Sequence, residues 1–319
     1  MRLLPAEPCA PIRLYDHEGA THIDWCLLGE ERFIDPFYTA TLRRLLTSPF
    51  RMTFRPRTAL ADYVRSLEQV PLRAPDGIIF HMSRCGSTLI ARALAQLNCL
   101  HVASEPAILE DALRRPPVDA ADSELRAVVH ALACDAPPSR RYIIKADCWH
   151  ILSFARLQRA FPRTPWVFIY RDPREVIASL LRQPAYWAVP GMPGGPTFKH
   201  LPDEAWLLPE GEYAARILAP ILHEAATAIA LGGGRLVNYE ELPAALWKKV
   251  ATHFRLELSV DERDELEHAA MVDAKTPALP FTPDSESKRA SLSADALEVC
   301  AKWLDGPYRA LELLRAAGS

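Results

Sequence analysis

The sequence predicts an α/β protein in which a parallel β-sheet is flanked by helices. From Gly77 onward, short apolar segments alternate with helical segments, which is typical of parallel strands joined by right-handed crossovers. Three of the apolar segments are unbroken, as expected for strands that are covered on both faces. Ligands of such sheets bind at the carboxyl ends of the strands, so the polar residues that follow each strand form the candidate site.

The predicted elements lie within residues 76–319, which we interpret as one domain. The strands are expected at Gly77–Met82, Tyr142–Ala146, Trp166–Tyr170 and Arg235–Tyr239. The helices are expected at about 86–98, 149–160, 173–182, 240–254 and 293–316.

Residues 1–75 lack this alternation and are predicted to form a mostly helical N-terminal extension. Their apolar residues approximate a helical stripe at Phe37, Leu42, Leu45 and Leu46. Pro75 marks the boundary with the domain that follows. The sequence assigns no chemistry to this extension.

Composition excludes several classes of protein. The 319 residues carry a formal net charge of −3, so no basic excess points to nucleic acid or to an anionic membrane. The seven cysteines include no CxxC pair, which argues against a disulfide framework and a structural zinc site. No apolar run approaches the length of a membrane span. We therefore expect a cytoplasmic protein that binds no nucleic acid, membrane or metal.

The strongest motif is the segment 77–97, in which a hydrophobic strand leads through a tight polar turn into a helix. This arrangement aims backbone N–H groups and the positive end of the helix at one point, where an anion can bind. Ser87 and Thr88 add hydroxyl donors, and Arg84 adds a permanent charge with forked donors for phosphate or sulfate oxygens. An ordinary strand–turn–helix connection is the alternative.

The turn departs from the loop of nucleotide-hydrolysing P-loop proteins, GxxxxGK[ST]. Aligned on Gly86, it has Ser87 at the position of the lysine and His81 at the position of the first glycine. A standard ATPase or GTPase is therefore not expected. A phosphotransferase that uses ATP remains the alternative from another class of enzyme.

A second basic motif follows the strand at Trp166–Tyr170. Arg171 ends this strand, Asp172 is suited to cap the next helix, and Ser179 lies eight residues after Arg171. The arginine and the serine can share an anion if the helix runs beside it. Alternatively, Arg171 forms a salt bridge at the start of the helix.

Together, the two motifs resemble those of the PAPS-dependent sulfotransferase superfamily, in particular of its bacterial-type members. The segment Ser83-Arg84-Cys85-Gly86-Ser87-Thr88 resembles the loop that cradles the 5′-phosphosulfate of PAPS (3′-phosphoadenosine 5′-phosphosulfate). The resemblance covers residues 77–316 and implies a P-loop-like sulfotransferase fold. It also implies that Arg171 and Ser179 bind the 3′-phosphate of PAPS.

Two smaller features have alternative interpretations. Lys288 and Arg289 resemble the basic loop that closes over the 3′-phosphate in many members, or they form a solvated basic pair. Cys85 stands where the family more often has serine or glycine. Its thiol is either acidified by the helix start and Arg84, or it is a small packing residue.

Sulfuryl transfer requires charge stabilisation, which Arg84 and the loop can supply, and a base for the acceptor's proton. Glu105 is the first candidate, because some sulfotransferases carry a base glutamate at a similar place; otherwise it is an acid at a helix start. Asp147 is the second, where cytosolic members have a base histidine; otherwise it caps a helix. Lys145 contacts the bridging oxygen of the donor or pairs with an acid, and His150 is a weaker third base.

The predicted reaction transfers a sulfuryl group from PAPS to a hydroxyl or amine of a small molecule or peptide, without a metal. The irregular segment 183–211 is rich in proline, glycine and aromatic residues and is too long for a simple connection. We interpret it as a lid over the acceptor pocket. A catalytically inactive nucleotide-binding module of the same fold is a further alternative, against which the intact motifs argue.

Overall fold

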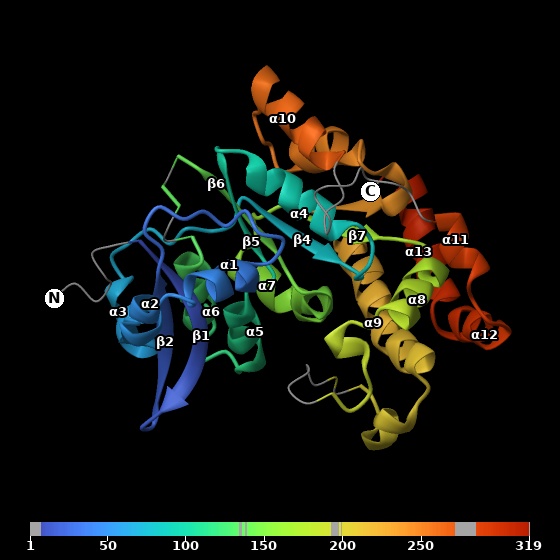
Figure 1. The fold of residues 1–319 in the computed structure, drawn as a ribbon, viewed down its shortest axis with the longest axis horizontal. Helices are drawn as coiled ribbons and strands as arrows, with labels where there is room; N and C mark the ends of the chain where they lie inside the picture. The colour runs from blue at the N-terminus through green and yellow to red at the C-terminus, as the bar shows by residue number, and fades with distance from the viewer. Residues whose placement is uncertain are drawn as a thin grey trace.

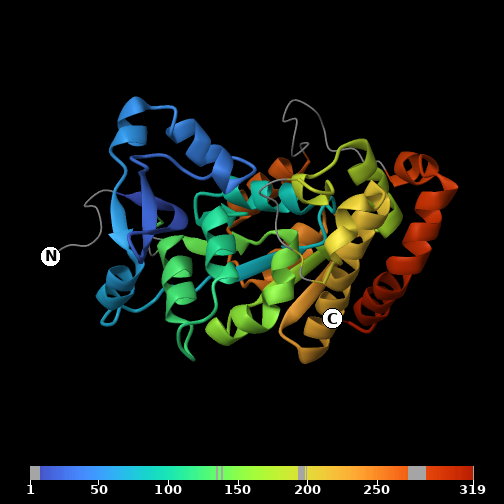
Figure 2. The same cartoon turned by 90° about the horizontal axis from the view of Figure 1, so that it is seen from below.

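A computed structural model of the protein describes residues 8–133, 136–137, 139–192, 198, 200–271 and 285–318. At its centre lies a five-stranded parallel sheet with helices on both faces (Figures 1 and 2). This arrangement confirms the predicted α/β class. The N-terminal strands and the last helices lie at opposite ends of the longest axis (Figure 1).

The five strands are ordered β5-β6-β4-β7-β8. They are β4 (Gly77–His81), β5 (Leu100–Ser104), β6 (Arg141–Lys145), β7 (Trp166–Tyr170) and β8 (Gly234–Asn238). The chain passes from the central β4 to the edge strand β5, returns to β6, and then crosses to β7 on the other side of β4. The winding therefore reverses at β4, and the carboxyl end of β4 is the switch point at which such sheets bind ligands. Every residue of β4, β5 and β7 is buried, which explains the largely apolar sequences of β4 and β7.

Helices pack around the sheet, and the chain ends in helices. They are α4 (Ser87–Gln96), α5 (Ala107–Arg114), α6 (Ser123–Ala131), α7 (Phe154–Ala160), α8 (Pro173–Arg182), α9 (Glu210–Leu231), α10 (Val260–Ala270), α11 (Ser285–Ala290), α12 (Ala294–Trp303) and α13 (Asp305–Ala316). Short 3₁₀ or π turns lie at 148–153, 186–188, 203–207, 239–241 and 246–251.

Two predicted helices are broken in the structure. The helix expected at 293–316 is two helices, because Pro307 lacks the N–H that would continue α12. Of the helix expected at 240–254, residues 245–253 are helical and include a π-helix at Leu246–Ala251, while Pro243 separates them from a 3₁₀ turn at Tyr239–Glu241.

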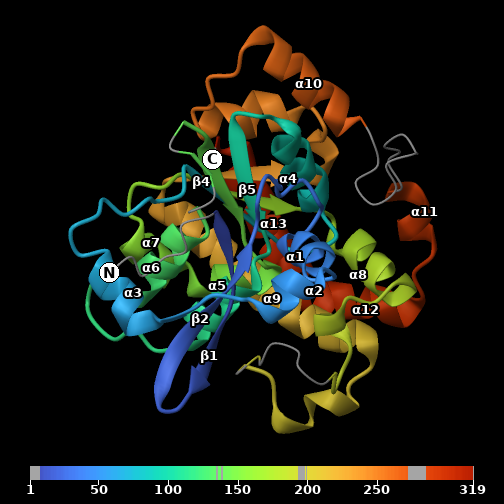
Figure 3. The same ribbon diagram turned by 60° about the vertical axis from the view of Figure 1, so that its left-hand side comes forward.

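The N-terminal part is not mostly helical, contrary to the prediction. It contains an antiparallel sheet of β1 (Cys9–His17), β2 (Ala20–Leu27) and β3 (Arg57–Ala59), with the short helices α1 (Tyr38–Leu45), α2 (Pro49–Thr53) and α3 (Leu60–Ser66). Glu18 and Gly19 join β1 to β2, and both have positive φ, as a two-residue hairpin turn requires. The hairpin packs against α5 and shares the hydrophobic core of the domain (Figure 3).

One helix of the described residues, α9, has a length and hydropathy that would allow it to cross a membrane. It is 22 residues long, and half of its most apolar window is buried. It packs against α8, α12 and α13, which is the environment of a core helix.

The turn after β4 depends on Gly86. This residue has φ = +84°, and a Cβ atom added to it would lie 2.6 Å from Cδ1 of Leu242. Gly86→Ala is therefore expected to lower the free energy of unfolding by about 1–3 kcal/mol, measured by urea denaturation. Gly306→Ala is the control, because Gly306 lies in α13 with nothing within 4 Å of an added Cβ. A Gly86→Ala variant as stable as this control would contradict the structural role of Gly86.

Candidate active site

A cavity of about 630 Å³ opens at the carboxyl edge of the sheet. At or within two residues of its end, each of the five strands contributes a side chain to the wall: His81, Glu105, Asp147, Arg171 and Tyr239. Ser83, Arg84, Cys85, Gly86, Ser87, Thr88, Ser179 and Lys288 also line it. The structure thus brings together most of the site residues that the sequence predicted.

The loop after β4 has an unusual backbone. Ser83, Arg84 and Gly86 have φ values of +71°, +51° and +84°. Left-handed backbone is costly for residues other than glycine, and such strain concentrates at ligand sites. The helix α4 begins at Ser87, and no side chain caps it, so its first N–H groups lie at the cavity wall without a capping acceptor.

Two arginines add positive charge beside this loop. Arg84 and Arg182 both line the cavity, and neither has an ion-pair partner among the described residues. The buried Nε of Arg84 also lacks a hydrogen-bond acceptor in that part of the chain. Burial, and then the neighbouring Arg182, lower the pKa of Arg84. A buried donor without an acceptor is costly, so this end of the cavity suits an anion.

Arg171 and Ser179 also lie together on the wall and are nearly buried. Nε of Arg171 donates to Glu175, and the Arg171 guanidinium lies 3.7 Å from the centroid of the Tyr239 ring. The salt bridge considered as an alternative is therefore present, and it leaves Arg171 on the cavity wall. Glu175 and Tyr239 fix the orientation of the guanidinium.

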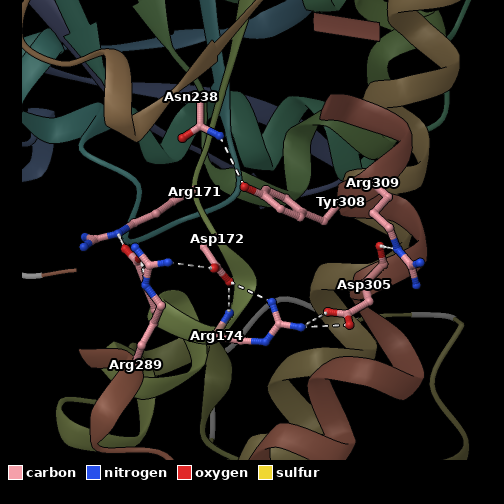
Figure 4. A network of polar contacts seen from close by, with 9 residues as sticks. Arg171, Asp172, Arg174, Asn238, Arg289, Asp305, Tyr308 and Arg309 are labelled. Carbon is pink, nitrogen blue, oxygen red and sulfur yellow. Dashed lines mark hydrogen bonds and ion pairs between the residues drawn. The ribbon is translucent and has the colours of Figure 1, made fainter. Parts of the chain in front are cut away.

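The two basic residues of α11 have different surroundings. Lys288 is buried on the cavity wall. Arg289 does not line the cavity: its Nε lies 2.9 Å from Oε1 of Glu175, and its Nη1 lies 3.9 Å from Oδ2 of Asp172 (Figure 4). Arg289 is therefore linked to Arg171 through the carboxylate of Glu175.

Glu105 is held in a strained position. Its φ is +51° directly before Pro106, where the left-handed region is disfavoured, and its N–H donates to the carbonyl of Lys145 (2.7 Å). Its carboxylate accepts from Nζ of Lys145, a side chain with no exposed surface. His81 Nε2 lies 3.3 Å from the same oxygen but is too poorly aligned for a hydrogen bond. Burial favours a higher pKa, but Lys145 and His81 outweigh it and lower the pKa of Glu105.

Asp147 caps the 3₁₀ helix at 148–153, which is the role predicted for it as the alternative to that of a base. Its side chain accepts from the backbone N–H of His150, and its own N–H donates to Nδ1 of His150 (3.1 Å). Burial raises the pKa of Asp147 to about 7, against the opposing effect of His150. Nε2 of His150 lies 2.7 Å from Glu110, so His150 is used within this cap and does not line the cavity.

Cys85 is a packing residue. Burial raises the pKa of its thiol to about 11, and Sγ donates to the carbonyl of Ile169 (3.1 Å). The thiol is therefore protonated at neutral pH and is not acidified by the helix start.

Aromatic side chains from three separate segments complete the wall. They are Phe37 from the N-terminal part, Trp149 after β6, and Tyr186 and Trp187 from the segment predicted as a lid. The rings of Trp149 and Tyr186 meet edge to face, 6.1 Å apart. Residues 193–197 and 199 of that segment lie outside the described residues, so the lid stays a prediction.

Sequence reasoning missed several residues of the wall. Arg182 lies three residues after Ser179, on the same face of α8, and that spacing was a usable signal. Phe37, Thr39 and Arg43 carried no such signal, because only the packing of the N-terminal part brings them to the cavity.

Comparison with known proteins finds similarity in structure only. No family model and no curated protein matches the sequence. Sulfotransferase STF9 from Mycobacterium avium is 14% identical, with 77% of this chain and 81% of that chain covered and a TM-score of 0.49. Mouse sulfotransferase SULT7A1, complexed with PAP, is 11% identical, with 80% and 92% covered and a TM-score of 0.42. Similarities at this level carry no information about the roles of the site residues.

Proposed function

We propose that the protein is a sulfotransferase that moves a sulfuryl group from PAPS to a hydroxyl or amine acceptor. The observation that carries the proposal is one cavity whose wall holds two sets of anion-binding groups, one around the loop after β4 and one at the end of β7 and on α8 and α11. Arg84, Arg182 and the loop fit the 5′-phosphosulfate of PAPS. Arg171, Ser179 and Lys288 fit its 3′-phosphate. A donor with anionic groups at two ends satisfies both sets.

In the proposed reaction, the acceptor atom attacks the sulfur of the donor. A bond forms between sulfur and the acceptor, the bond from sulfur to the bridging oxygen breaks, and adenosine 3′,5′-bisphosphate (PAP) leaves. Arg84 and the loop N–H groups stabilise the charge that develops on the leaving phosphate. The acceptor's proton passes to a base.

We propose Glu105 as this base, with Asp147 as the second candidate. Lys145 keeps Glu105 ionised, which is the state that accepts a proton, although a low pKa weakens a base. A bound sulfuryl anion competes for Lys145 and repels the carboxylate, and both effects raise the pKa of Glu105 toward the working pH. Asp147 has a pKa near neutrality, but its carboxylate is used in the helix cap.

The acceptor is proposed to be an aromatic or apolar small molecule, or a peptide side chain. The support is the aromatic part of the wall, formed by Phe37, Trp149, Tyr186 and Trp187. Action in the cytoplasm, without nucleic acid or membrane partners, belongs to the same proposal.

PAP is expected to bind in the absence of metal and to raise the melting temperature. At a concentration 100 times its dissociation constant, it should add roughly 2.7 kcal/mol of stability. Differential scanning fluorimetry in the presence of a chelator measures the shift.

The alternatives predict other results. A protein stabilised by ATP with Mg²⁺ but not by PAP is a phosphotransferase, and the proposal is then wrong. A protein that binds PAP but transfers no sulfuryl mass to any acceptor in a mass-spectrometric screen with PAPS is an inactive module.

A further inference from the structure

A second cavity, of about 930 Å³, lies at the opposite edge of the same sheet. Its wall includes residues at or just before the start of four strands: Asp76, Arg141, Pro165 and Gly233. A five-residue strand spans roughly 16 Å, so the sheet separates this cavity from the candidate active site. The segment 248–255 and the end of α13 complete the wall.

This wall is strongly basic. It carries seven arginine and lysine side chains and one carboxylate, a net charge of +6 in a chain whose net charge is −3. The cationic residues are Arg141, Arg163, Arg235, Lys248, Lys249, Arg255 and Arg315. We call this cavity the basic cavity.

Three of these cations have acidic partners. Arg141 pairs with Asp76 (2.9 Å), Lys249 with Glu241 (2.5 Å) and Arg315 with Glu312 (2.7 Å).

The other four cations have no ion-pair partner within the described ranges: Arg163, Arg235, Lys248 and Arg255. Like charges held together around one hollow repel one another, and a bound anion removes that repulsion.

Arg255 has φ = +52°, because it is the left-handed residue that ends the preceding helix: its N–H donates to the carbonyl of Thr252 (3.0 Å), and the N–H of Leu256 donates to that of Ala251 (2.9 Å).

We propose that the basic cavity binds a compact polyanion that carries two or more phosphate or sulfate groups. Four unpaired cations exceed what a single monovalent anion can neutralise. The cavity volume falls within the range of small-ligand sites, which favours a compact ligand over a polymer. The proposal is independent of the proposed function, because the two cavities share no residue.

Calorimetric titration with inorganic triphosphate and with sucrose octasulfate tests the proposal. The double variant Lys248→Gln/Arg255→Asn should bind at least about tenfold more weakly than the wild type. Asparagine is chosen because it tolerates the left-handed backbone at position 255. Arg263→Gln/Lys302→Gln, which removes two exposed positive charges that line neither cavity, is the matched control and should bind as the wild type does.

If only triphosphate binds, the ligand of the basic cavity carries phosphate groups; if only sucrose octasulfate binds, it carries sulfate groups. Either result supports the proposed site. The proposal is overturned if neither probe binds, or if only the control variant loses affinity.

His253 gives a second readout in the unaltered protein. It lines the basic cavity, and burial lowers its pKa, assisted by the charges of Arg235 and Arg255 and opposed by the hydrogen bond to the carbonyl of Gly233. A bound polyanion offsets those charges, so an NMR titration of the imidazole should show a higher pKa with the probe present. An unchanged titration at saturating probe would place the binding elsewhere.

Discussion

Replacing Glu105 with glutamine is expected to lower kcat by about 10²–10⁴-fold, while the affinity for PAP stays near that of the wild type. Glutamine keeps the size of the side chain but cannot take up the acceptor's proton. The variant also leaves the buried ammonium of Lys145 without its partner, so its folding is checked by thermal unfolding before rates are compared. Single-turnover rates and PAP calorimetry are the measurements.

Asp147→Asn is the matched control for this prediction. Asparagine caps a helix about as well as aspartate, so the substitution removes the charge and retains the cap. A folded but inactive Asp147→Asn variant beside an active Glu105→Gln variant would assign the base to Asp147.

The pH dependence of the wild type separates the same two carboxylates. A base must be deprotonated, so activity is lost as the pH falls below its pKa. If Glu105 is the base, the acid limb of kcat/KM lies well below neutrality, because the pKa of Glu105 is lowered in the free enzyme. The acid limb of kcat, which reports the bound complex, then lies at higher pH. If Asp147 is the base, kcat/KM falls as the pH drops below about 7, because burial raises the pKa of Asp147 to about 7.

Arg171→Ala is expected to weaken PAP by on the order of 10- to 150-fold. It should weaken adenosine 5′-phosphosulfate, which lacks the 3′-phosphate, far less. The fold should tolerate the change, because Arg289 still pairs with the buried Glu175. Ser179→Ala should show the same preference with a smaller loss.

Arg182→Ala is the control for Arg171→Ala, since it lies beside the loop proposed to hold the phosphosulfate. It should weaken both nucleotides. Equal losses of both nucleotides in Arg171→Ala, measured by calorimetry, would place Arg171 outside the 3′-phosphate subsite.

The sheet and the loop after β4 could be predicted because their signals are local. Strands such as Ile78–Phe80 and Trp166–Tyr170 are apolar throughout, and buried parallel strands need that composition. A polar residue such as Arg171 or Glu105 then stands where each strand ends, and parallel topology brings these ends together. Local pattern and overall fold therefore agree in this part of the chain.

The N-terminal hairpin and the contacts of Arg289 could not be predicted in this way. The turn at Glu18-Gly19 is a local signal, but the apolar stripe after Phe37 predicts a helix only for its own segment and not for the strands that precede it. The pairing of Arg289 with Glu175 joins residues far apart in the chain, and no spacing rule relates them. The same holds for Arg43, which reaches the cavity only through tertiary packing.

The cavity wall extends along the chain from Phe37 to Lys288, which has a consequence for biosynthesis. Chains are made from the N-terminus at about 5–20 residues per second, and early segments can fold before later ones exist. The hairpin and the central sheet can form on the ribosome, but the cavity wall is complete only after Lys288 has left the exit tunnel. Nascent chains stalled before that lysine should therefore contain a folded sheet and bind the nucleotide weakly.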